Sequence, residues 1–240
     1  MIRRSHLAAM LAVAVSLALA LPSDVDACCA APRPEGPIMV TPSGSTVAPG
    51  GAIVFYLSSD AIQHDIVLVR DGTTAEVALT RRELAPFVFA LAVSASASPG
   101  LHHVLVKRTA GQRAQGLEPY EIATVTIGGG PPVAPLAAPR GHVRLSSSPG
   151  RYGSTNRRAA FFFDGAPPVG VGLVFSWQEG GSARANAQWV APPNEPTMVA
   201  EGHCGIMPYG ASVPAPGTEV RVAYVDLAGR LGPWTSLRVE

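Results

Sequence analysis

The residues best suited to chemistry are a histidine and a cysteine that adjoin in the sequence, His203 and Cys204. Imidazole and thiolate groups both bind zinc and copper, and loop residues such as these can converge on an ion. Zinc sites normally use three or four protein ligands, however, and no second Cys or His stands at metal-site spacing from this pair. The fold would have to bring His64 or His142 to it. We therefore predict no metal site, and a metal carrier using His203 and Cys204 stays as the alternative.

A second pair of histidines, His102 and His103, opens a segment with the alternation of a strand, His102–Lys107. Successive side chains of a strand point to opposite faces of the sheet, so these two cannot hold one ion together. We expect one imidazole near the edge of the core and the other in solvent.

The polar residues of the predicted loops do not form a recognisable catalytic set. Ser147, Ser148 and Asp164 lack a G-x-S-x-G elbow, and no histidine stands at a catalytic spacing from a serine. The sequence also contains no H-E-x-x-H, no P-loop and no Rossmann glycine pattern. We predict a protein that is not an enzyme and that carries no cofactor.

The N-terminal segment has the features of an export signal. Arg3 and Arg4 precede the apolar run Leu7–Leu21, which is too short to span a bilayer comfortably and fits a secretory signal peptide. Small residues lie at the expected cleavage position, so residues 1–27 are predicted to be removed after Ala27. The mature protein is then periplasmic or extracellular.

Cleavage after Ala27 would leave Cys28 as the first residue, as in bacterial lipoproteins. An outer-membrane lipoprotein lipidated at Cys28 is therefore an alternative, although Asp26 stands where that signal expects a small uncharged residue. Contact with a membrane is predicted only in that case.

The mature chain alternates short apolar runs with turns. Hydrophobic residues make up 47% of the sequence, and its 25 glycines and 23 prolines favour many short strands. The expected strands of the first half include Ala52–Leu57, His64–Arg70, Phe87–Val93, His102–Lys107 and Ile122–Ile127. Arg81–Pro86 is predicted as a charged corner. This density of strands and turns is typical of an immunoglobulin-like β-sandwich.

A Gly/Pro-rich segment, Gly128–Pro139, predicts a linker, after which the plan repeats. A Pro-Gly turn precedes the strand His102–Lys107, and another precedes the strand Glu219–Val225. We predict an all-β protein of two tandem immunoglobulin-like sandwiches, with an extended lead-in (28–36), a first sandwich (37–128), a linker (129–140) and a second sandwich (141–240).

Four aromatic residues suggest two different roles. Trp189, Trp234, Tyr152 and Tyr209 would make a platform for a sugar or a protein partner if they gathered on one face. Such residues more often cover the ends of a sandwich core, which is the role that we expect here.

Two stretches resemble known modules. In Pro216–Trp234, a Pro-Gly-Thr turn leads into an alternating strand that ends in Asp-x-Ala-Gly, which resembles the end of a fibronectin type III or related bacterial Ig-like domain. Ile38–Leu57 is similar to the opening of bacterial Ig-like domains, with a turn before an apolar strand. The resemblance implies modules that serve as spacers, adhesins or binding domains of exported proteins.

These observations predict a non-catalytic exported module of the bacterial cell envelope, structural or partner-binding, whose partner is an envelope protein or polysaccharide. The net charge of +1, without a basic run, argues against nucleic acid as a partner. The alternative function is a periplasmic carrier of copper or zinc.

The three cysteines generate the first prediction, a disulfide between Cys204 and either Cys28 or Cys29. Exported thiols meet an oxidising compartment, and the adjacent Cys28 and Cys29 would form a strained ring with each other. Closing so long a loop contributes about 4 kcal/mol in the loop-entropy model. Non-reducing peptide mapping of freshly exported protein should recover the bridged peptides, whereas an alkylatable Cys204 would contradict the bridge.

Overall fold

The computed structural model describes residues 37–56, 65–107, 113, 116, 118–129, 135–149, 155–190, 196–202 and 213–240. The predicted signal peptide, His64, His203 and all three cysteines lie outside the described residues. Within the described ranges, sixteen strands form four sheets, and the protein is an all-β sandwich fold as predicted. No helix in these ranges has the length and apolar character that a membrane span needs.

Two sheets form the first sandwich, and we number the sheets in the order in which they stack. Sheet 1 consists, in spatial order, of β2 (Thr46–Val47), β9 (Tyr120–Ile127), β8 (Gly100–Lys107), β4 (Asp65–Arg70) and β5 (Glu76–Val77). Sheet 2 consists of β1 (Ile38–Met39), β3 (Ala52–Tyr56), β7 (Val88–Val93) and β6 (Leu79–Ala85). Their facing sides enclose a core that includes Phe55, Leu68 and Val125.

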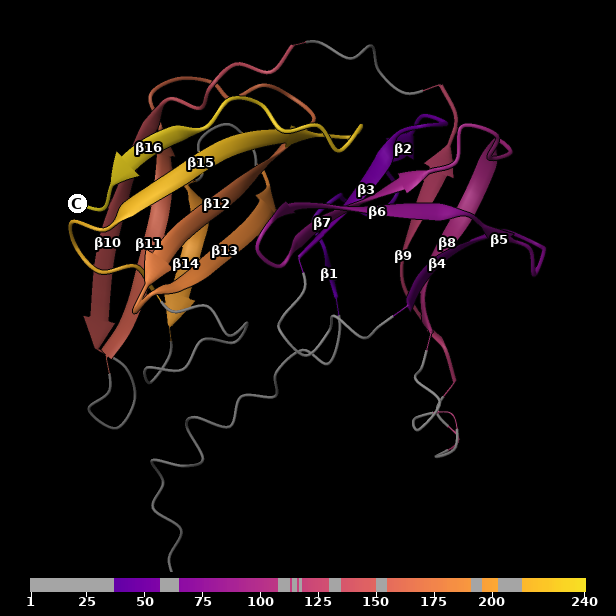
Figure 1. Ribbon diagram of the computed structural model, residues 1–240, viewed down its shortest axis with the longest axis horizontal. Coiled ribbons are helices and arrows are strands. Elements are labelled where there is room, and N and C mark those ends of the chain that lie inside the picture. The colour runs from indigo at the N-terminus through magenta and orange to yellow at the C-terminus, as the bar shows by residue number, and fades with distance from the viewer. Residues whose placement is uncertain are drawn as a thin grey trace, which may run out of the picture.

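The second sandwich repeats this plan with two further sheets (Figure 1). Sheet 3 consists of β13 (Ser182–Trp189), β12 (Val171–Glu179), β15 (Glu219–Asp226) and β16 (Thr235–Arg238). Sheet 4 consists of β10 (Gly141–Pro149), β11 (Thr155–Phe163) and β14 (Thr197–Gly202). Phe161, Phe175 and Trp177 lie in the core between them. We propose that the two sandwiches are the domains predicted from the sequence, with bounds 37–128 and 141–240.

A third apolar cluster joins the two sandwiches face to face. Val54, Tyr56 and Val88 of sheet 2 pack in one cluster with residues of sheet 3, among them Val174 and Val225. Alternate residues of β3 therefore enter two different cores, and all five of its residues are buried. A strand buried on both faces requires a continuous apolar run, which is the pattern of β3 in the sequence.

Strand β6 corrects the prediction of a charged corner at Arg81–Pro86, because it continues to Ala85 and pairs with β7. Its charged residues are tolerated since long side chains can cover apolar surface while the charge stays in solvent. The guanidinium of Arg81 lies 3.5 Å from the centre of the Phe89 ring. Arg82 donates a hydrogen bond to the carbonyl of Gly229 in the other sandwich.

The turn Asp226–Arg230 of the second sandwich forms hydrogen bonds with the first sandwich. The Asp226 carboxylate accepts hydrogen bonds from the backbone N–H of Ala228 and of Arg230, each at 2.9 Å. The carbonyl of Leu227 then accepts a hydrogen bond from the N–H of Ala52 at 3.0 Å. Gly229 has φ of +68°, and a Cβ on it would lie 2.7 Å from Cβ of Ala52. Only glycine fits this turn against sheet 2 without a shift of the neighbouring backbone.

This close approach predicts that Gly229→Ala destabilises the protein by about 3 kcal/mol, from steric overlap added to left-handed strain. The matched control is Gly217→Ala, because Gly217 has φ of +77° and no atom lies within 4 Å of the position that its Cβ would take. The control should lose about 1 kcal/mol, from backbone strain alone. Urea unfolding of both variants measures the difference, and equal losses would show that the two sandwiches do not meet at Gly229.

Candidate functional site

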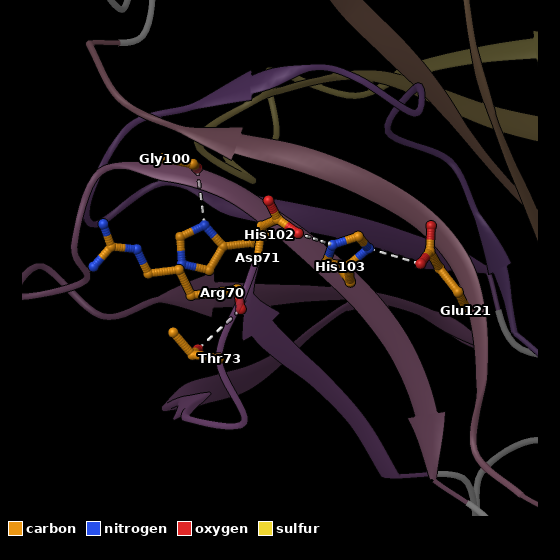
Figure 2. Close-up of polar contacts among 7 residues, drawn as sticks. All are labelled: Arg70, Asp71, Thr73, Gly100, His102, His103 and Glu121. Atoms are coloured by element: carbon orange, nitrogen blue, oxygen red, sulfur yellow. Dashed lines mark hydrogen bonds and ion pairs between the residues drawn. The ribbon is translucent and has the colours of Figure 1, made fainter.

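The two adjacent histidines of β8 mark one end of the first sandwich, beside the turn that follows β4 (Figure 2). They point to opposite faces of sheet 1, as the strand alternation predicts. His102 is fully buried, whereas the side chain of His103 lies on the outer face and is 29% exposed. Two identical side chains, one residue apart, therefore have different surroundings and different hydrogen-bond partners.

His103 lies between two carboxylates. Its Nδ1 is 2.7 Å from Oε2 of Glu121, and its Nε2 is 3.0 Å from Oδ1 of Asp71. Ionised carboxylates only accept hydrogen bonds, so both ring nitrogens donate and the ring is an imidazolium. The hydrogen bonds to Asp71 and Glu121 raise the pKa of His103, and the hydrogen bond from His103 lowers the pKa of Asp71. Both carboxylates are held by the charge of one ring.

The backbone places the two carboxylates on either side of the ring. Asp71 begins the turn after β4, where its N–H donates to the carbonyl of Leu101 at 2.9 Å. Glu121 reaches the outer face because a β-bulge interrupts the pairing of β8 with β9 between Val104 and Leu105. Without the extra residue, strand alternation would turn Glu121 toward the core. The bulge is thus what allows the second carboxylate to contact His103.

His102 has one nitrogen that is paired and one that is not. Its Nδ1 is 2.9 Å from the carbonyl oxygen of Gly100, which can only accept, so Nδ1 carries the hydrogen. In the neutral ring Nε2 is then an acceptor, and this buried atom has no hydrogen-bond partner among the described residues.

A hollow of about 320 Å³ lies at this end of the sandwich, between the turn after β4 and the loop that joins β7 to β8. The residues that line it include Arg70, Ser94, Ser96, Ala97 and the buried His102. The hydroxyl oxygens of Ser94 and Ser96 are 2.8 Å apart. The hollow combines hydroxyl groups, a cation and a buried imidazole, which suits the binding of a polar ligand.

Of the residues singled out for metal binding, the structure describes only His142. His142 lies in the other sandwich, where its ring stacks on Phe162 and its Nδ1 is 3.6 Å from Oδ1 of Asp164. His203, Cys204 and His64, like Cys28 and Cys29, lie outside the described residues. The described ranges hold no group of three or more His, Cys, Asp or Glu side chains able to share a metal ion. Asp71 and Glu121 contact opposite ends of the His103 ring, so that cluster does not converge on one point.

Two other sequence predictions have clear outcomes. Ser147 and Ser148 lie in strand β10 and not in a loop, because the hairpin of β10 and β11 extends to the pair Pro149 and Thr155. Of the four aromatic residues, Trp234 packs against the cluster between the sandwiches, and Trp189 ends β13 in strand alternation with Ala185 and Ala187 of that cluster. Tyr152 and Tyr209 lie outside the described residues.

Comparison with known proteins found no matching family model and no matching curated protein. Two solved structures have weak likeness to the chain. One is the surface protein SGBP-B of the mixed-linkage glucan utilization locus of Bacteroides ovatus, in complex with a mixed-linkage heptasaccharide, at 12% identity and a TM-score of 0.27, covering 87% of this chain and 46% of that one. The other comprises the fibronectin(III)-like modules of Clostridium thermocellum CbhA, at 12% identity and a TM-score of 0.19, covering 85% of this chain and 92% of that one. The chain spans about half the length of the first, and likeness of this degree assigns no function.

Because two carboxylates contact His103, we predict that the pKa of His103 lies above 6.5 when it is measured by NMR titration. Because folding raises this pKa, the stability that His103 contributes is complete below about pH 6.5 and is lost as the pH rises through the folded pKa. Asp71 contributes in the opposite sense, with stability present above about pH 3.8 and lost as the pH falls. Asp71→Asn should lower the pKa of His103, and Arg238→Gln, on the distant strand β16, should leave it unchanged. A His103 pKa at or below 6.5 in the unmodified protein would contradict the contacts of His103 with Asp71 and Glu121.

Proposed function

We propose that this protein is a non-catalytic exported module of the bacterial cell envelope that binds an envelope protein or polysaccharide. The observation that carries the proposal is the hollow at the end of the first sandwich, where Arg70 and His102 present hydrogen-bonding groups without partners among the described residues. Unpaired polar groups that converge on a hollow mark a candidate ligand site.

Two groups of paired charges lie near the hollow and have a structural role. Both nitrogens of His103 are engaged by carboxylates, and Glu76 is engaged by Lys107, whose Nζ lies 2.7 Å from its Oε1. These pairs hold the turn after β4 and the neighbouring strands in position beside the hollow.

The rigid attachment of the two sandwiches also supports this function. Domains in one chain move relative to each other by default, unless a large apolar interface holds them. Here sheets 2 and 3 share an apolar cluster, and the turn at Leu227–Gly229 adds hydrogen bonds across the junction. Such a body holds a binding surface at a fixed distance and orientation from the rest of the chain, as a spacer or binding module requires.

Co-sedimentation of the exported protein with isolated cell envelopes tests the proposal. We expect saturable binding, and recovered envelope material that is chemically unchanged. Treating the envelopes with protease beforehand separates the two partner classes, since binding to polysaccharide survives it and binding to protein does not. Absence of saturable binding, or turnover of the envelope material that one point substitution abolishes, would overturn the proposal. Stoichiometric copper or zinc in the purified protein would support the carrier instead.

A further inference from the structure

The hollow at the end of the first sandwich has two unmet requirements of opposite kind. In the neutral ring, Nε2 of His102 is a buried acceptor without a donor. The guanidinium of Arg70 is an exposed donor group with a full positive charge that can pair with an anionic acceptor. Both residues line the hollow, and they are direct cross-strand partners in the pairing of β4 with β8. Cross-strand partners point to the same face, so one ligand can reach both side chains.

The ring of His102 is fixed so that its unpaired nitrogen lies away from the strand backbone. The hydrogen bond from Nδ1 to the carbonyl of Gly100 sets the tilt of the ring. Figure 2 shows Nε2 on the other side of the ring, toward Arg70. A buried polar atom without a partner is costly, and a ligand that donates to it removes that cost. The group that meets His102 must therefore carry a hydrogen on oxygen or nitrogen.

The charge of Arg70 is not neutralised by the nearby carboxylates, because each is already engaged. Asp71 binds His103, and Glu76 binds Lys107. No ion pair or side-chain hydrogen bond of Arg70 exists in the described part of the chain, and its side chain is exposed at the rim of the hollow. A guanidinium matches a carboxylate through two parallel hydrogen bonds.

We propose that this hollow binds an acidic sugar unit, which carries a carboxylate beside hydroxyl groups. The carboxylate pairs with Arg70, a ring hydroxyl donates to Nε2 of His102, and Ser94 and Ser96 contact the remaining hydroxyls. The apolar side chains of the lining give the faces of the sugar ring a surface to pack on. A volume of about 320 Å³ suits one small unit rather than a long chain segment. The inference rests on the proposed function and assigns its partner to the polysaccharides.

Simpler anions satisfy only half of these requirements. Acetate and sulfate would pair with Arg70, but neither has a hydrogen to donate to His102 at neutral pH. A neutral sugar would satisfy His102 and leave the charge of Arg70 without a partner. Only a ligand with both groups satisfies the whole site, and this difference makes selectivity the quantity to measure.

Calorimetric titration of the exported protein with glucuronate and galacturonate tests the site against glucose, acetate and sulfate. We expect at least one uronate to bind about tenfold or more tightly than each control compound. Arg70→Gln should weaken uronate binding by about tenfold or more. The matched control, Arg238→Gln, replaces an exposed arginine of β16 in the other sandwich and should not change it. NMR spectra of the ring nitrogens should show Nε2 of His102 shifting on uronate addition, which needs no substitution in the core.

Any of the following results would overturn the inference. Equal binding of uronate to the Arg70→Gln variant, or an unchanged Nε2 signal of His102, would place the ligand elsewhere. Equal affinity for glucose, acetate or sulfate would remove the requirement for an acidic sugar. If envelopes bind the protein saturably while both uronates fail, this inference is wrong and the proposed function stands. If envelope binding fails as well, the proposed function is wrong too.

Discussion

Burial of the two central strands of sheet 2, β3 and β7, on both of their faces is the constraint on which the rest of the structure depends. Ile53 and Phe55 face sheet 1, while Val54 and Tyr56 face sheet 3, so neither sandwich covers its apolar residues alone. Small residues line this junction, which lets the sheets approach closely, and a glycine in the turn after β15 fits between them. The hollow at the end of the first sandwich lies outside this junction, since its lining shares no residue with the cluster between the sandwiches.

The sequence predicts which segments form strands better than it predicts which sheets cover those strands. Ala52–Leu57 is apolar throughout, which correctly indicates a fully buried strand, but the run does not say what covers its second face. That cover comes from residues far along the chain, such as Val174. The prediction of a corner at Arg81–Pro86 is wrong because charge does not exclude a strand: Arg81 packs its guanidinium over an aromatic ring.

For the candidate site, too, the sequence predicts local features and not long-range contacts. Strand alternation alone places His102 and His103 on opposite faces, and the structure confirms this. Their chemistry depends on long-range pairing that alternation does not contain. In the sequence Asp71 indicates only a turn, and Glu121 reaches His103 only because a bulge reverses its face. Nδ1 of His102 contacts the backbone carbonyl of Gly100, which leaves Nε2 as the unpaired nitrogen. A sequence pattern does not predict this contact.

The double burial of β3 and β7 also bears on the order in which the protein is made. The last strand of sheet 2 is synthesised by residue 93, whereas strands of its second cover extend to residue 238. Domains fold from the N-terminus as the chain is made. Until the second sandwich arrives, Val54, Tyr56 and Val88 stay uncovered, and an exposed apolar sheet of this kind promotes aggregation. A chain that ends at the linker would thus be a substrate for chaperones and proteases rather than a stably folded single sandwich.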